Sequence, residues 1–273
     1  MITLNCCQID LLKLFHGGFS TGHGFLREPN SIRSYASLAC IAIQSNQNDM
    51  FGGQSINAFD YAMAEGVKKS FKKIIAAEVS RACEFCEIAP AAEIDFSVCT
   101  YSEKENPAAV ENLTAVVGTK KLAEKIYRQA CRDVEEETHQ AMEALIHNFN
   151  TLHSRAGAQV PFSSINYGMD TSPEGRLATR EVLNAIEAGL GNGETPIFPI
   201  SIFQLKSGVN YNIDDPNYDL FIRACEVSAK RLFPNFSFID APFNLQYYKA
   251  GHPETEIAYM GCQIGRASCR ERV

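Results

Sequence analysis

The spacing of apolar residues predicts a long helix in the middle of the chain. Between Lys120 and Ser154 they recur at intervals of three, four or seven residues, as on one face of an α-helix. The apolar positions are Leu122, Ile126, Ala130, Val134, Ala141, Leu145, Phe149 and Leu152. The pattern indicates one long helix or two helices end to end. Such a helix can line a subunit interface or lie buried within one subunit, and the pattern favours neither.

The part of the chain before this helix predicts further helices separated by glycine-containing turns. In chain order, the predicted elements are a strand or tight turn leading into a short helix at 2–15, a loop at 16–24, a helix from an N-cap at Asn30 or Ser31 to about Asn46, a glycine turn at 49–54, and a helix at about 57–79. Residues 80–118 carry no clear period.

After residue 157 short apolar segments alternate with helical ones. The predicted strands are 160–168, 196–206 and 236–239. The first intervening helix begins at Thr171-Ser172-Pro173-Glu174, whose spacing fits a capping box with proline in the first turn. The second is capped by Asp215 or Asn217 and reaches Arg231. An order of strand, helix, strand, helix and strand predicts parallel α/β units.

Composition narrows the class of protein. The chain has 273 residues, 45% hydrophobic and 21% charged, which excludes a disordered or fibrous protein. Its net charge of −7 argues against a general nucleic-acid or anionic-membrane binder, although an acidic protein can still hold a nucleotide in a positive pocket. The sequence has no apolar run of the roughly 18–20 residues that a membrane span needs, and Met1 to Asp10 does not resemble a secretory signal.

The ten cysteines are irregularly spaced in a chain too long for a small disulfide-stapled fold. We therefore expect a cytoplasmic protein with mostly reduced thiols, some of which carry chemistry. Cys83 and Cys86 form a CxxC with Cys99 nearby, a spacing that zinc sites use. A second CxxC is missing and the histidines show no ligand spacing, so we favour free thiols and assign no metal ligands.

Three features stand out as candidate chemistry: the pair Cys6-Cys7, the glycine-punctuated region 161–199, and Met260-Gly261-Cys262. A single buried cysteine is usually a small hydrophobic residue, so each feature alone is weak. In combination they resemble the anaerobic (class III) ribonucleoside-triphosphate reductase family. The segments that carry the resemblance are NCCQID (5–10), DMFGGQS (49–55), HSRAGAQVPFSSINYG (153–168), GLGNGETPIFP (189–199), DPNYDL (215–220), SAKRLFP (228–234) and MGC (260–262).

The resemblance covers residues 2–263 and implies an α/β fold. Family members have a ten-stranded α/β barrel with a cysteine on a loop through its centre, as other glycyl-radical enzymes do. This chain would form part of that barrel, with long helices N-terminal to the half barrel and packed on it. The implied division is a first strand and loop at 1–27, a mainly helical interface and effector region at 28–154, and a β/α half barrel with the cysteine loop at 155–263.

The resemblance also implies roles for two thiols. Cys262 matches the thiyl-forming cysteine, which removes the 3′ hydrogen of the ribose before the 2′ hydroxyl leaves as water. Cys6 matches the partner cysteine on the facing strand. Cys7 would point to the opposite face of that strand and serve packing. Sulfur suits this role because its hydrogen is removed and returned at modest cost, provided that the site excludes solvent.

Substrate and effector contacts follow less directly. Helix N-termini attract anions, so Thr171 and Ser172 are candidate contacts for the substrate triphosphate, with a plain structural cap as the alternative. In the family, ATP or deoxynucleotide effectors bind helices at a homodimer interface, which here corresponds loosely to 28–80 and 120–154. The other implied partners are a radical-SAM activating enzyme and a reductant, either formate or a thiol protein.

The last ten residues, 264–273 (IGRASCRERV), resemble an in-frame translation of a sequencing adapter. Family members continue past Cys262 with an active-site asparagine, structural zinc cysteines and the radical glycine. We therefore expect a fragment that is inactive alone and poorly soluble, because a partial barrel leaves an open sheet edge and exposed apolar surface.

Two alternatives remain from other classes. A glycyl-radical enzyme of the formate acetyltransferase type would carry two adjacent cysteines at its loop tip, whereas Cys262 stands alone. A non-catalytic nucleotide-binding relic that dimerises through its long helices is the second.

Overall fold

The computed structural model describes residues 6–50, 52–153 and 159–260 of the chain. Their centre is a five-stranded sheet in the order β1-β4-β5-β6-β7, and every neighbouring pair in it is parallel. The strands are β1 (Cys7–Asp10), β4 (Gln54–Asn57), β5 (Ser163–Tyr167), β6 (Ile200–Leu205) and β7 (Asn235–Phe238). Two short strands, β2 (Phe19–Ser20) and β3 (Phe25–Leu26), form a separate antiparallel pair.

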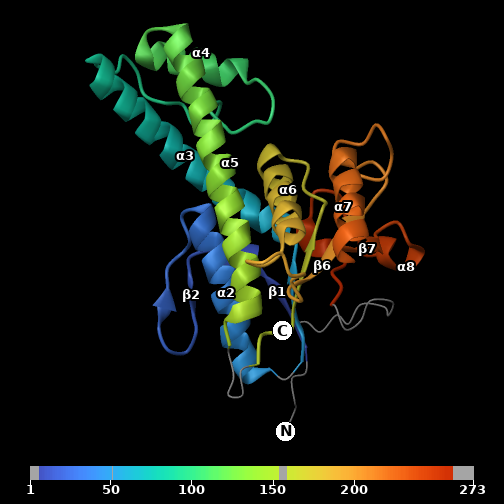
Figure 1. The fold of residues 1–273 in the computed structure, drawn as a ribbon. Helices are drawn as coiled ribbons and strands as arrows, with labels where there is room; N and C mark the ends of the chain where they lie inside the picture. Colours follow the sequence, from blue (N-terminus) through green and yellow to red (C-terminus); the bar gives the residue numbers. More distant parts are fainter. Residues whose placement is uncertain (1–5, 51, 154–158, 261–273) are drawn as a thin grey trace.

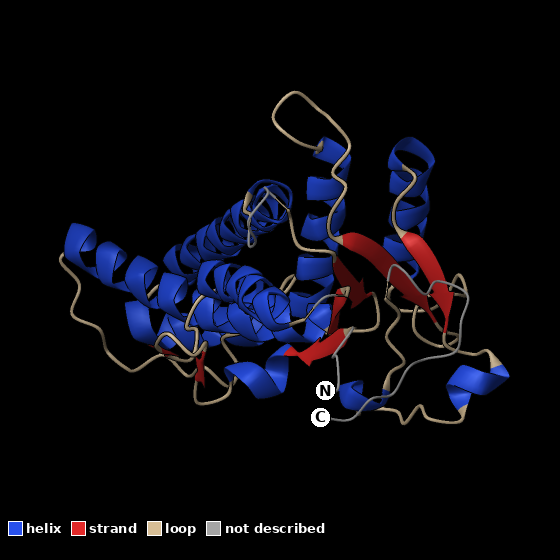
Figure 2. Cartoon of the chain, turned by 90° about the horizontal axis from the view of Figure 1, so that it is seen from below, coloured by secondary structure: helices blue, strands red, loops and turns tan. Residues whose placement is uncertain are grey.

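Helices cover one face of this sheet. They are α1 (Leu11–Phe15), α2 (Ile32–Asp49), α3 (Phe59–Cys86), α4 (Pro107–Val117), α5 (Lys120–Thr151), α6 (Pro173–Ala188) and α7 (Tyr218–Arg231). The short helix α8 (Pro242–Leu245) and the 3₁₀ turn η1 (Pro253–Thr255) follow β7. Figure 2 shows the long helices on one side of the strands and the segment after β7 on the other. Because the parallel strands follow one another in chain order, their crossovers pass over the same face, as in a barrel.

The core lies between the sheet and these helices. Ile56, Ile165, Tyr167 and Phe203 point to the helical face and are fully buried. The apolar stripe of α5 is buried along its length, including Ile126, Val134 and Leu145. The prediction of an α/β protein with a parallel half barrel and long packed helices is thus confirmed. Of the two possibilities for residues 120–154, one long helix or two end to end, the structure has the single helix α5. Helices α3, α4 and part of α5 extend beyond the sheet (Figure 1).

The structure differs from the predicted elements at several places. Strand β4 begins at Gln54, the last residue of the predicted glycine turn at 49–54. Strand β2 lies within the predicted loop at 16–24, and β3 follows directly after it. Helix α3 continues past residue 79 to Cys86, and the segment without a clear period contains α4. The cap of α6 is Ser172 rather than Thr171, because the Ser172 hydroxyl accepts the hydrogen bond from the Gly175 amide.

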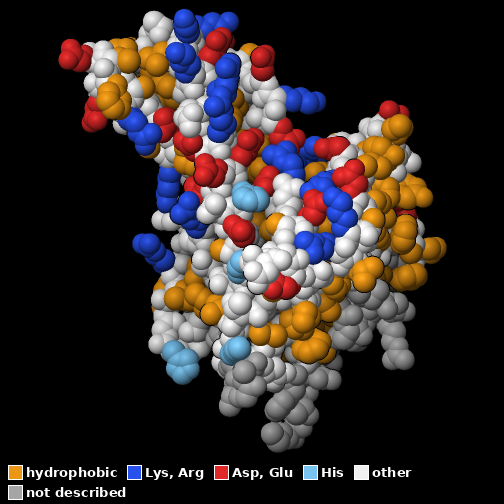
Figure 3. Space-filling view, viewed as in Figure 1, with side chains coloured by type: hydrophobic (Ala, Val, Ile, Leu, Met, Phe, Trp, Pro, Cys, Tyr) orange, Lys and Arg blue, Asp and Glu red, His pale blue; other side chains and the backbone are white. Residues whose placement is uncertain are grey.

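Apolar side chains are exposed at the β7 end of the sheet. Leu232, Phe238, Phe243 and Leu245 are all exposed, and hydrophobic side chains gather over α7, β7 and α8 in Figure 3. Within the described residues β7 is an edge strand, since it pairs on one side only. Strand edges and apolar patches of this kind favour association. No helix in the described parts of the chain is both long and apolar enough to cross a membrane.

Candidate active site

The face of the sheet that the helices leave open carries a row of polar side chains. Successive residues of a strand point to opposite faces, and the polar set is Gln8, Ser55, Asn166 and Gln204, one residue from each of β1, β4, β5 and β6. Gln8 lies beside Ser55 in the register of the parallel strands. Ser55 and Asn166 are fully buried and Gln204 is 1% exposed. Buried polar groups need hydrogen-bond partners, so something must cover this face.

The covering element is the segment from Glu256 to Met260, which we call the crossing segment. Its backbone carbonyls accept hydrogen bonds from the sheet: Gln8 Nε2 donates to Ala258 at 2.8 Å and Gln204 Nε2 to Ile257 at 2.8 Å. Ile257, Ala258 and Met260 are buried. The chain therefore passes through the concave side of the half barrel immediately before Gly261 and Cys262.

The two N-terminal cysteines lie on different faces. Alternation along β1 places Cys7 opposite Gln8, against the helices, where the Asn46 side chain of α2 contacts its thiol. Burial raises the pKa of the Cys7 thiol above its ordinary value. Cys6 precedes β1, is half-buried, and shares the polar face with Gln8 by the same alternation. Cys262 lies outside the described residues.

The start of α6 contains both candidate substrate contacts. Thr171 is exposed and Ser172 is half-buried. The Ser172 hydroxyl accepts from the Gly175 amide at 3.1 Å, and its own amide donates to Asp170 Oδ1 at 2.8 Å. A side chain at Gly175 would collide with the Asp170 carboxylate. The helix start thus already holds one carboxylate, and Thr171 has the exposed hydroxyl.

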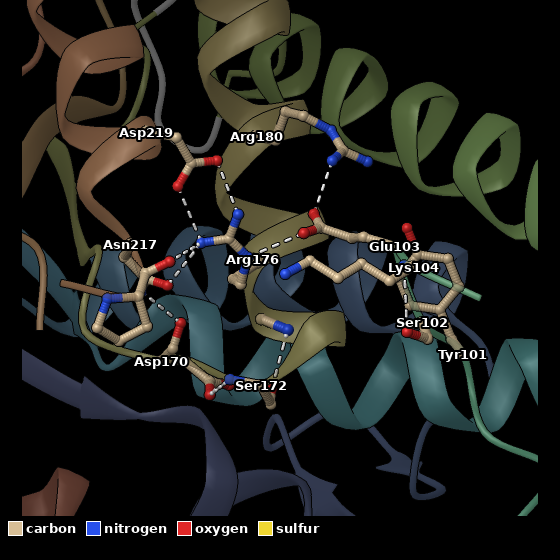
Figure 4. Close-up of polar contacts among 12 residues, drawn as sticks. Tyr101, Ser102, Glu103, Lys104, Asp170, Ser172, Arg176, Arg180, Asn217 and Asp219 are labelled. Carbon is tan, nitrogen blue, oxygen red and sulfur yellow. Dashed lines mark hydrogen bonds and ion pairs between the residues drawn. The ribbon is translucent and has the colours of Figure 1, made fainter. Parts of the chain in front are cut away.

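An arginine network braces this helix start, as Figure 4 shows. Arg176 Nε donates to Glu103 at 2.9 Å, and its Nη2 donates to Asp219 at 2.7 Å at the start of α7. Arg180, one turn further, donates to the other oxygen of Glu103 at 2.7 Å. These contacts connect the loop between α3 and α4 with the starts of α6 and α7. The side chain of Lys104 extends toward the same helix start in Figure 4.

A buried carboxylate supports the loop after β5. Asp60, in the first turn of α3, accepts hydrogen bonds on one oxygen from the amides of Gly168, Met169 and Asp170, at 2.8 to 2.9 Å. Burial and the nearby Asp170 charge raise the pKa of Asp60 to about 6, although the amide donors lower it. Asp60 therefore positions the loop that leads to Ser172.

A second carboxyl group stands at the beginning of the crossing segment. Glu256 Oε1 accepts a hydrogen bond from the Tyr61 hydroxyl at 3.2 Å, and its Oε2 is buried with no partner among the described residues. Burial, then the Asp60 charge, raises the pKa of Glu256 to about 9. At neutral pH this carboxyl group is protonated.

The remaining sequence-based candidates are separate from this site. Cys83 and Cys86 lie at the end of α3, far along the helix from the sheet (Figure 1). Within residues 6–50, 52–153 and 159–260, no group of three or more His, Cys, Asp or Glu residues could hold a metal ion. Asp60, Asn166 and Glu256 were not predicted as site residues.

A sequentially ordered parallel sheet, with helices on one face and the crossing segment on the other, defines half of an α/β barrel of the ribonucleotide reductase type. The sequence model of the family described as anaerobic ribonucleoside-triphosphate reductase matches residues 1–271. The chain belongs to this family.

Individual proteins agree with this assignment. The chain is 28% identical over 232 residues to the anaerobic ribonucleoside-triphosphate reductases of Haemophilus influenzae and Escherichia coli, covering 85% of this chain and 27% of each relative. The enzyme of that name from Enterobacteria phage T4 is 26% identical over 260 residues, 95% of this chain and 35% of the relative. The chain therefore spans about a third or less of the length of these relatives.

Two solved structures share the fold. One, an anaerobic ribonucleotide reductase, superposes with a TM-score of 0.52 at 11% identity, over 89% of this chain and 32% of that one. The other, the anaerobic ribonucleotide reductase from Thermotoga maritima in complex with dATP and CTP, gives 0.51 at 12% identity, over 89% and 35%. The family match favours a reductase over the formate acetyltransferase alternative.

Proposed function

We propose that this chain supplies the two-thiol part of the active site of an enzyme that reduces ribonucleoside triphosphates to 2′-deoxyribonucleoside triphosphates under anaerobic conditions. The observation that carries the proposal is the crossing segment. Its hydrogen bonds to the polar face hold the backbone up to Met260 inside the half barrel, on the face that Cys6 shares.

In this proposal Cys262 exchanges a hydrogen atom with the 3′ carbon of the ribose. Cys6 gives a proton to the departing 2′ hydroxyl. A glycyl radical, which the family resemblance places outside this chain, would supply the unpaired electron. The buried apolar residues around the crossing segment, Ile257 and Met260 among them, would exclude water from the reaction.

We extend the proposal to the triphosphate at the start of α6. The exposed hydroxyl of Thr171 is the donor that we propose for phosphate oxygens at the positive end of α6. The Gly175 and Arg176 amides already donate to Ser172, and the Lys104 side chain extends toward the start of α6 (Figure 4). Ser172 contributes through the cap that orders this turn, since its hydroxyl already accepts from Gly175.

The partners are proposed on the family's chemistry. The Thermotoga maritima structure holds dATP and CTP, and we propose nucleotide effectors on the helices of 28–80 and 120–154, a homodimer, a radical-SAM activating enzyme, and formate or a thiol protein as reductant. Residues 1–27, 28–154 and 155–263 remain our proposed division of the chain. No step is assigned to zinc, which no cluster of described residues could hold.

The test uses the complete product of the reading frame, activated anaerobically and supplied with CTP and a reductant. We expect dCTP from the wild type and a loss of at least about a thousandfold in Cys6→Ala and Cys262→Ala, since each removes a reacting group. Cys7→Ala is the matched control and should retain activity within about threefold. Full activity of either reacting-thiol variant would overturn the proposal. The prediction that the 273-residue chain is inactive alone is tested in the same assay.

A further inference from the structure

We propose that Asn166, together with Gln8, Ser55 and Gln204, is a backbone clamp that sets the register of the crossing segment. These are positioning residues, and they make no contact with substrate in the proposal. The purpose of the clamp rests on the proposed function, because the residue that it would place is Cys262. The holding of the crossing segment depends only on hydrogen bonds among described residues.

Asn166 pairs with Tyr259 as one strand residue pairs with another. The Tyr259 amide donates to Asn166 Oδ1 at 2.8 Å, and Asn166 Nδ2 donates to the Tyr259 carbonyl at 3.0 Å. The same Nδ2 also donates to Ser55 Oγ at 2.9 Å, which fixes the orientation of the amide. Both backbone groups of one residue are therefore satisfied by one side chain that is 93 positions away in the sequence.

The other clamp residues extend this pairing across the sheet. Ser55 Oγ donates to the same Tyr259 carbonyl at 2.9 Å. Gln8 reaches Ala258 from β1, and Gln204 reaches Ile257 from β6. Four adjacent strands thus each give one side chain to three consecutive residues of the crossing segment.

The fifth strand holds the segment indirectly through the Tyr259 ring. The Tyr259 hydroxyl donates to Asn244 Oδ1 at 2.8 Å. Asn244 is 1% exposed, and its Nδ2 donates to the Phe238 carbonyl at the end of β7 at 2.6 Å. Tyr259 is therefore held at its amide, its carbonyl and its hydroxyl.

The clamp supplies hydrogen-bond partners for the backbone of the crossing segment. The backbone groups of a parallel sheet are used by its own ladder, so a segment crossing its face finds no backbone partners there. Side-chain amides and a hydroxyl supply them instead. A shift of the crossing segment by one residue would remove both Asn166 bonds and reverse which side chains face the sheet. Because Cys262 follows Tyr259 by three positions, the register decides which residue reaches Cys6.

The first test is hydrogen exchange by mass spectrometry on the 273-residue chain, read on peptides covering 256–260. We expect Asn166→Ala to accelerate exchange there about tenfold or more, because two hydrogen bonds to Tyr259 are lost. The matched control is Asn150→Ala. Asn150 accepts from the Ile197 and Phe198 amides and donates to the Phe198 carbonyl, so it holds a different loop in the same manner.

The comparison of the two variants decides the proposal. Acceleration at 256–260 in Asn166→Ala but not in Asn150→Ala supports the clamp. Equal acceleration in both variants shows a general loss of stability and overturns it, as does unchanged exchange in Asn166→Ala. Ser55→Thr keeps the hydroxyl and should exchange as the wild type does, whereas Ser55→Ala should exchange faster at 256–260. Equally fast exchange in Ser55→Thr and Ser55→Ala would contradict the proposal that the Ser55 hydroxyl helps to hold Tyr259.

The second test reads the position of the thiol. Diamide oxidises two neighbouring thiols to a disulfide, and peptide mapping measures how fast the link between Cys6 and Cys262 forms. We expect at least about fivefold slower linking in Asn166→Ala, and the wild-type rate in Asn150→Ala. Unchanged linking would overturn the positioning role. If exchange responds as expected but the wild type forms no such link, the clamp stands and the cysteine pairing of the proposed function is wrong.

Discussion

The protonated carboxyl group of Glu256 makes the stability of this chain depend on pH in a definite direction. Its pKa is raised from 4.5 to about 9 by burial, then by the charge of Asp60, with smaller contributions from Asp170 and Glu254. Tyr61 is the group that donates to it. The perturbation is Glu256→Gln, which keeps the shape and the acceptor for Tyr61 but carries no proton to lose.

The sign follows from proton binding. Between pH 4.5 and about 9 the folded chain holds a proton on Glu256 that the unfolded chain has released. Stability is therefore fully present below pH 4.5 and is lost as the pH rises toward 9. Each pH unit in this window costs at most about 1.4 kcal/mol, so the wild type loses at most about 4 kcal/mol between pH 5 and pH 8 from this group.

The assay is urea unfolding of wild type and Glu256→Gln at pH 5, 6, 7 and 8. The variant should gain on the wild type steadily with pH, by up to about 4 kcal/mol at pH 8 relative to pH 5. Asp60, with its pKa of about 6, titrates in both proteins and cancels in the difference. Glu111→Gln is the control, because Glu111 is exposed and is not among the groups that shift the pKa of Glu256, so its difference from the wild type should be constant. A constant difference for Glu256→Gln as well would refute the reasoning.

Two further predictions concern the start of α6. Ser172→Ala should lower the free energy of unfolding by about 1 kcal/mol, while Thr171→Ala should stay within about 0.5 kcal/mol, because only Ser172 caps the helix; the reverse order in urea unfolding would contradict the observed cap. Arg176→Met should cost about 1–3 kcal/mol, since it removes a largely buried guanidinium that pairs with Glu103 and with the start of α7. Arg81→Met, which removes an exposed guanidinium that pairs with Glu78 in the same helix, should change the free energy of unfolding by less than about 0.5 kcal/mol. Equal effects of the two arginine variants would count against the network.

The helices of this fold were predictable where one face is apolar. The stripe of α5 repeats over the whole element, and its burial in the structure follows that stripe. Strand β4 was not predictable by the same reasoning, because Gln54 and Ser55 beside Ile56 give no apolar run. Its backbone pairs with β1 and β5, and this pairing depends on tertiary structure that local sequence does not encode.

The site was predictable only in part. The alternation in Ser164, Ile165 and Asn166 signals a strand with one polar face, but its partner Tyr259 lies 93 positions away. Asp60 and Glu256 are ordinary acidic residues in the sequence. Burial raises the pKa of both, followed by the Asp170 charge at Asp60 and the Asp60 charge at Glu256. The capping-box spacing of Thr171 and Glu174 predicted a cap one residue too early, because the neighbouring Ser172 hydroxyl accepts the hydrogen bond instead.

The central claim is that a thiol at the end of the crossing segment removes the 3′ hydrogen of a ribonucleotide. The most direct measurement compares CTP with 3′-deuterated CTP in the complete, anaerobically activated protein. We expect dCTP from both, slower formation from the deuterated substrate, and none from either with Cys262→Ala. Formation of dCTP by Cys262→Ala, or no dCTP from the activated wild type, would contradict the account.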